Sequence, residues 1–407
     1  MKLSRPKRID GRVPVLSAAD AINYIPDEAT LCVLGAGGGI LEATTLINAL
    51  AEKYKNAHSP RNLSLISPTG LGDRADRGIS PLAQEGLVKW ALCGHWGQSP
   101  RISDLAEQNK IAAYNYPQGV LTQTLRASAA HQPGILSEIG IGTFVDPRQQ
   151  GGKLNEVTTE DLIKLVEIDN KEYLYYKAIA PNIAFIRATT CDSEGYATFE
   201  DEVMYLDALV IAQAVHNNGG IVMMQVQKMV KKATLHPKAV RIPGYLVDIV
   251  VIDPDQTQLY GGAPVNRFIS GDFVLDDSQQ TALPLNQRKL VARRALFEMR
   301  KGAVGNVGVG IADGIGLVAR EEGCADDFIL TVETGPIGGI TSQGIAFGAN
   351  VNTRAILDMT SQFDFYHGGG LDVCYLSFAE VDRHGNVGVH KFNGKIMGTG
   401  GFIDISA

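Results

Sequence analysis

The feature that most constrains the fold of this chain is a recurring order of elements. A short apolar run leads into a glycine-containing loop, and a segment of helical character can follow the loop. The runs and their loops are Leu31–Leu34 with Gly35–Gly39, Leu63–Ile66 with Ser67–Gly70, and Ile111–Tyr114 with Tyr116–Gly119. Strands that alternate with helices through short loops are typical of crossover-connected α/β structure. The sequence therefore predicts an open α/β fold with mainly parallel sheets.

The second half of the chain repeats short landmarks of the first half in the same order. The matched pairs are Gly35-x-Gly37 with Gly308-x-Gly310, Thr69-Gly70 with Thr334-Gly335, and Asp192-x-x-Gly195 with Asp382-x-x-Gly385. Each match is weak alone, but chance dipeptides need not keep their order along a chain. The series therefore indicates two related domains.

A boundary between two domains is expected near residue 284. The 407 residues exceed what one ordinary core organises. Leu283-Pro284 interrupts the chain, and Asn286 can cap a helix that runs to about Lys301, with Gly302 as its stop. We predict an N-terminal domain over 1–284, a C-terminal domain over 285–407, and an active site in the cleft between them.

A carboxylate follows one of the predicted strands. Glu333 is the first residue after the apolar run Phe328–Val332, and glycines follow at 335, 338 and 339. Ligands sit outside the carboxyl ends of strands in open α/β sheets, so Glu333 is a candidate nucleophile or general base. The alternative is a glutamate that caps a helix or solvates a loop. Pro68 holds the matched position in the first half, whereas a feature needed for folding should occur in both copies, so the asymmetry favours a chemical role.

Composition excludes several classes of protein. The net charge of −7 and the pI of about 5.7 argue against an electrostatic nucleic-acid binder. The five cysteines are scattered and form no C-x-x-C, which indicates neither a disulfide framework nor a zinc ribbon. The basic start lacks the apolar core of a signal peptide, and no apolar run has membrane-spanning length. We expect a reduced, cytoplasmic protein with no membrane or nucleic-acid partner.

Three glycine motifs fail their tests. The run GAGGGI at Gly35–Ile40 has isoleucine where a dinucleotide fingerprint needs glycine, so a backbone nest for an anion or a plain helix-start loop remains. His367–Gly370 copies an esterase oxyanion loop, but the chain contains no G-x-S-x-G. The run QQGGK at Gln149–Lys153 lacks the residues of a phosphate loop. The eight histidines are scattered, and we assign no metal.

Several longer motifs together resemble one family. They are VETGPIGG around Glu333, GTFVDPRQQGGKLN at Gly142–Asn155, and the late segments FYHGGGLDV and GTGGFIDI. The chain is similar to the family I coenzyme A transferases, and above all to fused, single-chain members that act on short-chain acyl-CoA and acetate. The likeness runs from about Val15 to the last residue.

The resemblance implies roles for particular residues. Glu333 would be the catalytic nucleophile, and the loop Gly37, Gly38 and Gly39 would supply oxyanion N–H donors, with Gly38 the best single choice. Gln118, in the loop after Ile111–Tyr114, would lie at the acyl pocket. Gly368 and Gly369 would let coenzyme A approach closely.

The reaction implied is transfer of coenzyme A between short-chain carboxylates, by a ping-pong route through a glutamyl-CoA thioester. Coenzyme A would be a substrate, with no other cofactor, in a homo-oligomer that serves short-chain fatty acid or ketone-body type metabolism. Two alternatives stay open: a thioesterase on the same scaffold, and a non-catalytic ligand sensor.

The end of the chain carries two further expectations. Gly400–Ala407 alternates like a strand, and fused members of the family continue appreciably further. We therefore expect the C-terminal domain to be truncated here, or to need a separately made partner that covers an exposed sheet edge.

Overall fold

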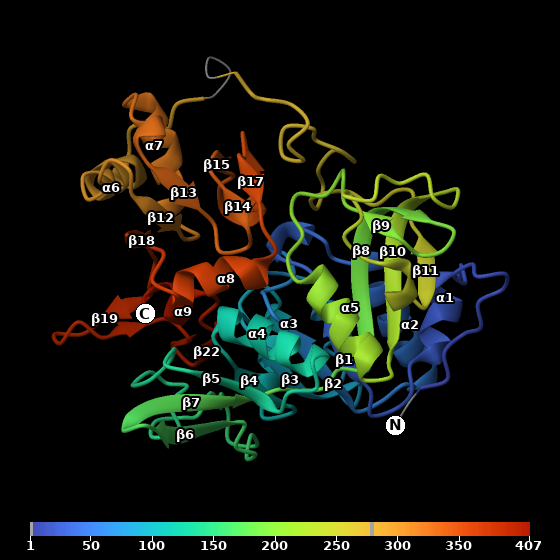
Figure 1. Cartoon of the computed structure of the whole chain (residues 1–407). Coiled ribbons are helices and arrows are strands. Elements are labelled where there is room, and N and C mark those ends of the chain that lie inside the picture. The colour runs from blue at the N-terminus through green and yellow to red at the C-terminus, as the bar shows by residue number, and fades with distance from the viewer. Residues whose placement is uncertain (1–2, 277–280) are drawn as a thin grey trace.

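The computed structural model describes residues 3–276 and 281–407, and it contains two main sheets joined by a long connection (Figure 1). The first sheet has the order β11-β10-β8-β1-β2-β3-β4, and every pair along this path is parallel. Its strands are β1 Thr30–Val33, β2 Leu63–Ser67, β3 Val88–Cys93, β4 Ala112–Asn115, β8 Ile183–Asp192, β10 Ile221–Val230 and β11 Ile249–Ile252, with β9 Ala197–Thr198 antiparallel to β8.

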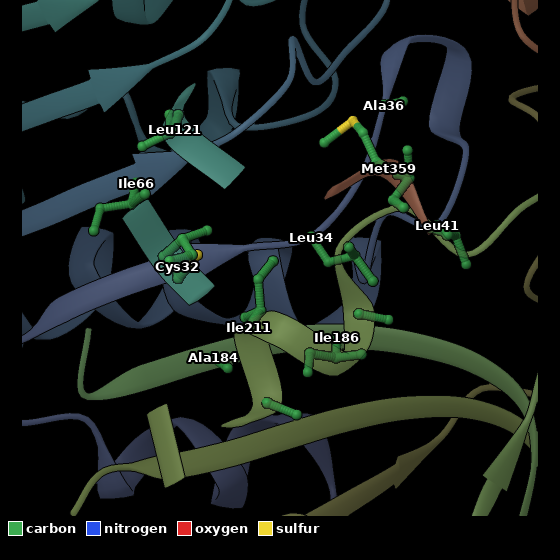
Figure 2. Packing of buried hydrophobic residues seen from close by; sticks show 14 of the residues in the cluster. Cys32, Leu34, Ala36, Leu41, Ile66, Leu121, Ala184, Ile186, Ile211 and Met359 are labelled. Carbon is green, nitrogen blue, oxygen red and sulfur yellow. The ribbon is translucent and has the colours of Figure 1, made fainter. Parts of the chain in front are cut away.

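Helices cover both faces of this sheet because the side chains of its strands alternate between two cores. On β1, Cys32 packs with helices α4 and α5, whereas Leu31 and Val33 pack with α1, α2 and α3. Figure 2 shows the first of these cores, with Ile211 of α5 over the sheet. The helices are α1 Ala18–Ala21, α2 Thr44–Ala57, α3 Pro100–Glu107, α4 Gln118–Ala129 and α5 Ala208–Asn217. The α/β fold predicted from the sequence is confirmed.

The second sheet has the order β17-β14-β13-β12-β18. Strand β12 is parallel to its neighbours β13 and β18, while β14 and β17 add antiparallel pairs. The strands are β12 Val304–Val307, β13 Ile329–Thr331, β14 Pro336–Ile337, β17 Ala355–Ile356 and β18 Val373–Tyr375, and the helices of this half are α6 Gln287–Leu296, α7 Ile315–Glu321, α8 Met359–His367 and α9 Phe402–Ile405.

Smaller antiparallel units stand beside the two sheets. They are the sheet β5 Gly134–Ser137, β7 Lys171–Lys177 and β6 Ile163–Ile168, and the hairpins β15 Ile340–Thr341 with β16 Asn350–Val351, β19 Glu380–Val381 with β20 Val387–Gly388, and β21 Lys391–Phe392 with β22 Lys395–Ile396.

The internal repeat is visible in the topology. The parallel order β8-β1-β2 in the first sheet matches β18-β12-β13 in the second, and the glycine landmarks follow corresponding strands. The third landmark is the same turn in both copies. The Asp192 carboxylate accepts the N–H groups of residues 194 and 196, and that of Asp382 accepts those of residues 384 and 386. The two halves are therefore related, as the sequence indicates.

The predicted boundary lies in the long connection between β11 and α6. Asn286 caps α6, and its side chain accepts the N–H of Lys289 at 3.1 Å. The α-helix ends at Leu296 rather than near Lys301, because the next three N–H groups bond to carbonyls three residues back. Gly302, at φ +80°, follows as the expected stop. The division at 284 and 285 itself stays a prediction.

The last segment is a helix, not the strand that its alternation suggested. Residues 402–405 form α9, in which Ile403, Asp404 and Ile405 are all buried. Three consecutive buried residues suit a short helix wedged between neighbours better than a half-exposed strand. Asp404 accepts the N–H of Val120 at 3.1 Å and contacts His367 Nε2 at 3.0 Å. Two long-range polar contacts thus fix a segment whose local pattern is ambiguous.

Helix α8 joins the second half to the first. It packs on α4, and its residue Met359 reaches into the core of the first sheet (Figure 2). Phe363 is completely buried and lies so close to Gly119 that a Cβ there would come within 2.5 Å of the ring. A glycine at 119 therefore allows the two helices to approach.

We predict that Phe363→Ala lowers the free energy of unfolding by about 3–5 kcal/mol, because it removes a fully buried ring and leaves a cavity. Phe365→Ala is the matched control, since Phe365 lies on the same helix and is 42% exposed. Urea unfolding followed by circular dichroism measures both variants. Equal losses in the two would contradict the importance of the interface between α4 and α8.

Candidate active site

Glu333 stands on a tight turn just beyond β13. The N–H of Val332 bonds to the carbonyl of Pro336, and the N–H of Gly335 returns to Val332 O, both at 3.0 Å. Gly335 has φ +123°, and a Cβ there would lie 2.1 Å from the carbonyl oxygen of Leu357. Only glycine fits this position, so the turn that presents Glu333 is rigidly specified.

The turn opens into a cleft of about 310 Å³ between the two halves. Its walls are loops at the carboxyl ends of strands from both sheets, as expected for ligand sites in open α/β folds. Seven strands are each followed by a residue that lines the cleft. These residues are Gly37 after β1, Thr69 after β2, His95 after β3, Gln118 after β4, Gly308 after β12, Glu333 after β13 and Leu376 after β18. Among the described residues that line the cleft, Glu333 is the single acid, and none is a lysine or arginine.

The environment of Glu333 favours its neutral form. Burial raises the pKa of Glu333 to about 7, and the negative charge of Asp404 adds to the increase, while its own N–H and the amide of Asn306 oppose it. Its Oε2 is buried and meets no hydrogen-bond partner within the described parts of the chain. A carboxylate so poorly solvated is a stronger nucleophile than one in water, provided that it is ionised.

The glycine loop after β1 divides its residues between the cleft and the interior. Gly37 lines the cleft. The N–H of Gly38 donates to Gly72 O at 2.8 Å, and a Cβ on Gly38 would lie 2.3 Å from Ile345 O of the second half. Gly39 faces the ring of Tyr260 on the side away from the cleft. Of the three predicted oxyanion residues, the structure thus places Gly37 at the cleft. The N–H of Gly38 is bonded to Gly72 O, and Gly39 does not line the cleft.

Gln118 occupies the first position of α4 and lines the cleft, as its predicted role requires. Its side chain is buried, and its Nε2 lies 3.3 Å from the sulfur of Met359. Its backbone N–H donates to Gly400 O at 3.1 Å. The residue is therefore placed by contacts to the late part of the chain.

Gly368 and Gly369 do not lie in the cleft. They terminate α8: the N–H of Gly368 bonds to Asp364 O at 3.1 Å, and Gly369 takes φ +82°. Both are exposed. The end of the helix, with a left-handed residue at 369, explains glycine at these positions. The structure therefore gives no support to the predicted contact with coenzyme A.

Sequence reasoning missed several residues of the cleft. His95, Gln98 and Thr334 all line it, and each carries a buried polar atom with no hydrogen-bond partner in the described chain. Burial, with the charge of Arg74, lowers the pKa of His95 to about 4, so its imidazole is neutral. The position of His95 and Gln98 just past β3 was the available signal. Gly400 and Gly401 also line the cleft, and a Cβ on Gly401 would lie 3.4 Å from Glu333 Cγ.

The described residues offer neither a metal site nor a membrane-spanning helix. In the described ranges, no group of three or more His, Cys, Asp and Glu side chains is arranged to hold a metal ion. None of the helices in these ranges is both long and apolar enough to cross a membrane.

The fold and cleft define an α/β protein of two related halves with one carboxylate between them, and comparison with known proteins places it. The family model described as "Coenzyme A transferase" matches residues 15–253. Acetate CoA-transferase YdiF of Escherichia coli K12 is 92% identical over 407 residues, which are all of this chain and 77% of that protein. Caffeate CoA-transferase of Acetobacterium woodii is 40% identical over 400 residues, 96% of this chain and 76% of that one.

Solved structures agree. The acyl-CoA transferase (YdiF) apoenzyme of E. coli O157:H7 superposes with a TM-score of 0.95 at 91% identity, over 99% of this chain and 76% of that chain. A thioester complex of the same enzyme with CoA gives a TM-score of 0.95 at 90% identity, with the same coverage. The chain belongs to the coenzyme A transferase family, and it is a CoA-transferase of the single-chain type.

We predict that the rate of acyl transfer rises with pH through about 7. A glutamate nucleophile must be ionised to attack a carbonyl, and the raised pKa of Glu333 leaves it protonated below that pH. Single-turnover rates with an acyl-CoA between pH 5.5 and 8.5 measure the limb. A limb near the ordinary glutamate value of 4.5 would contradict the burial assigned to Glu333.

Proposed function

We propose that this enzyme transfers coenzyme A from a short-chain acyl-CoA to acetate or a similar carboxylate through a thioester on Glu333. The observation that carries the proposal is the placement of Glu333, with an unpartnered oxygen, in a cleft whose other described lining residues include no acid, lysine or arginine. The similar enzyme from E. coli O157:H7, whose structure is described as a thioester complex with CoA, supports it.

The reaction needs two covalent exchanges at Glu333. Its carboxylate attacks the acyl-CoA carbonyl carbon, the C–S bond breaks, and CoA leaves as thiolate with a mixed anhydride formed. The thiolate then attacks the glutamyl carbonyl carbon, and the bond between this carbon and the bridging oxygen of the anhydride breaks. The donor acid leaves as its carboxylate, and glutamyl-CoA remains. The acceptor carboxylate reverses both steps, so no ATP is consumed.

Each exchange passes through an oxyanion. Fixed N–H donors stabilise such an intermediate by roughly 3 kcal/mol each. Gly37 and Gly401 both line the cleft, and their backbone N–H groups are suited to this task, whereas the N–H of Gly400 is engaged with Gly94 O. Gln118 at the inner wall would contact the acyl group. The cleft also carries an apolar wall that can cover the pantetheine arm and exclude water, formed by Ile345, Phe347, Leu376, Phe378, Val389, Phe392 and Met397.

The alternatives make different demands on the same cleft. A thioesterase would need a base to activate water beside the thioester. Apart from Glu333, the described lining residues offer His95, whose pKa of about 4 makes it a weak base. A ligand sensor would need no nucleophile, so an ionisable carboxylate with a pKa near 7 would be a cost without a benefit. Both observations favour transfer.

Steady-state kinetics should show a ping-pong pattern. With acyl-CoA and acetate both varied, double-reciprocal plots should give parallel lines, since the first product leaves before the second substrate binds. EDTA, and the omission of ATP or nicotinamide, should change nothing. Release of CoA in water as fast as in acetate would instead identify a thioesterase.

Glu333 should become labelled by CoA when acyl-CoA is supplied without an acceptor. Intact mass should increase by one CoA per active site, and peptide mapping should place the adduct on the segment that holds Glu333. Glu333→Ala should abolish label and turnover. Glu333→Asp should lose about a hundredfold, because a misplacement of about 1 Å has that effect.

The matched control is Glu322→Ala, since Glu322 is an exposed acid of the same half, paired with Arg293 on the surface. It should label and turn over normally. An adduct that persists in Glu333→Ala, or that maps to a cysteine, would overturn the mechanism.

Cytoplasmic location, assembly as a homo-oligomer and a role in short-chain fatty acid or ketone-body type metabolism stay predictions. Sedimentation of the purified protein would test the oligomeric state directly.

A further inference from the structure

The loop Gly37–Gly39 is closed by a bond from the N–H of Ala36 to Ile40 O, but it has no side chains that could fix the peptide groups between them. Three successive glycines carry no side chains, and Gly38 and Gly39 take φ of +80° and +92°. A free loop of this kind would sample many orientations of its peptide groups. Its N–H groups can serve as donors only if residues outside the loop fix those peptides.

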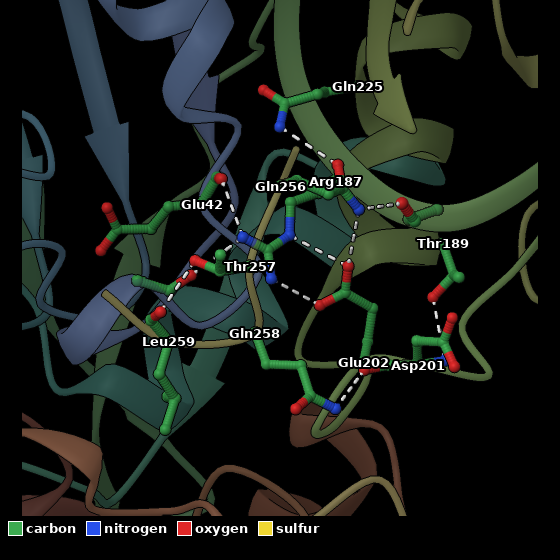
Figure 3. Close-up of polar contacts among 12 residues, drawn as sticks. Glu42, Arg187, Thr189, Asp201, Glu202, Gln225, Gln256, Thr257, Gln258 and Leu259 are labelled. Carbon is green, nitrogen blue, oxygen red and sulfur yellow. Dashed lines mark hydrogen bonds and ion pairs between the residues drawn. The ribbon is translucent and has the colours of Figure 1, made fainter. Parts of the chain in front are cut away.

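Three backbone groups of the loop form hydrogen bonds with residues that do not line the cleft. The N–H of Gly38 donates to Gly72 O, and the carbonyl of Gly38 accepts the N–H of Tyr260, both at 2.8 Å. The carbonyl of Gly39 accepts Arg187 Nη1 at 3.1 Å. Figure 3 shows Arg187 between Glu42 and Glu202, and Glu202 pairs with its guanidinium at 2.6 Å.

Glu42 ties two of these holding groups together. Its side chain is completely buried, and its Oε1 accepts the N–H of Gly72 at 2.7 Å. Its Oε2 accepts the hydroxyl of Tyr260. The residues that grip Gly38 on its N–H side and on its carbonyl side are thus both bonded to one carboxylate. A Cβ on Gly35 would lie 2.6 Å from Glu42 Cγ, so glycine at 35 makes room for this carboxylate beneath the loop.

Tyr260 contributes more than its hydroxyl. Its ring lies against Gly39, where a Cβ would come within 2.8 Å of it. The hydroxyl also accepts the N–H of Gly78 at 2.9 Å, and the guanidinium of Arg77 lies 4.8 Å from the ring centroid. Tyr260 belongs to the long connection between the two halves. Through this residue the connection contacts Gly38 and Gly39 of the loop.

We propose that Glu42 and Tyr260 are positioning residues that fix the glycine loop opposite Glu333. Neither lines the cleft, so neither touches the substrate. They act by setting the peptide planes of Gly38 and Gly39, and hence the direction of the Gly37 N–H, which is the donor that the loop has at the cleft. The inference rests on the proposed function, since it assigns the loop to oxyanion stabilisation.

The two residues predict a pattern of variants. Tyr260→Phe keeps the ring against Gly39 and removes the hydroxyl that bonds to Glu42. Glu42→Ala leaves the N–H of Gly72 without its partner, whereas Glu42→Gln retains an acceptor for Gly72 and can donate to the Tyr260 oxygen. The glutamine variant should therefore recover most of what the alanine variant loses.

Tyr54→Phe is the matched control. Tyr54 lies on α2, the helix that follows Glu42, and its hydroxyl donates to Glu85 O at 2.8 Å away from the cleft. Removing that hydroxyl is an equally small change in a buried tyrosine of the same region. It should leave turnover unchanged.

The experiment measures three quantities for each variant well below its melting temperature. They are the single-turnover rate of CoA adduct formation on Glu333, the KM for acyl-CoA, and hydrogen exchange in peptides that cover 35–43 and 70–79. We expect Tyr260→Phe and Glu42→Ala to slow adduct formation about tenfold or more, with KM within twofold and faster exchange in both peptides.

The outcomes separate this inference from the proposed function. If the wild type labels Glu333 and Tyr260→Phe labels it at the same rate as Tyr54→Phe, the positioning role is wrong. Equal rates in the Ala and Gln variants of Glu42 would also overturn it. If the wild type forms no adduct on Glu333, the proposed function fails instead, and faster exchange in the variants would still show that the loop is held by these residues.

Discussion

The candidate site depends on one set of long-range contacts, those that attach the late part of the chain to the first sheet. The N–H groups of Trp96 and Gly97 both bond to Met397 O, and Gly400 bonds back to Gly94 O. Together with the packing of α8 on α4, these bonds bring the turn that carries Glu333 against loops whose sequence positions are hundreds of residues away. Without them the two sheets would present their carboxyl ends to solvent, and there would be no enclosed cleft.

The chemistry follows from what this enclosure removes. A carboxylate in water is a weak nucleophile because it is well solvated. In the cleft Glu333 loses water without gaining a cation, since the lining residues that the structure describes include no lysine or arginine. The imbalance raises its pKa towards neutrality, and the anion that forms above that pH is reactive. An arginine at the same place would stabilise the anion and weaken the attack.

The sequence anticipated those parts of the molecule that local pattern controls. The buried strand β1 appears as an apolar run, and so does β13, of which Thr331 is buried and Ile329 exposed. The missing counterpart of Glu333 in the first half predicts a chemical role for that residue. Features set by distant contacts escaped it. Residues 402–405 read as a strand because helix α9 is stabilised through Val120 and His367. The Gly368–Gly369 pair ends α8 outside the cleft, and its contact with coenzyme A stays a prediction. Tyr260 gave no signal, since it lies in an irregular connection and its contacts with Gly38, Gly39 and Glu42 are long-range, the last spanning 218 positions.

The proximity of Asp404 to Glu333 bears on the lifetime of the intermediate. Asp404 is buried, with one oxygen unpartnered among the described residues, and its charge disfavours the ionised form of Glu333. Burial is the main cause of the raised pKa of Glu333, and conversion to the proposed thioester replaces the buried carboxylate by an uncharged group. The ionised free enzyme therefore carries an unfavourable buried charge that the thioester does not. That difference favours storage of the coenzyme on the protein while the second acid is awaited, at no expense to the nucleophile's reactivity in the first exchange.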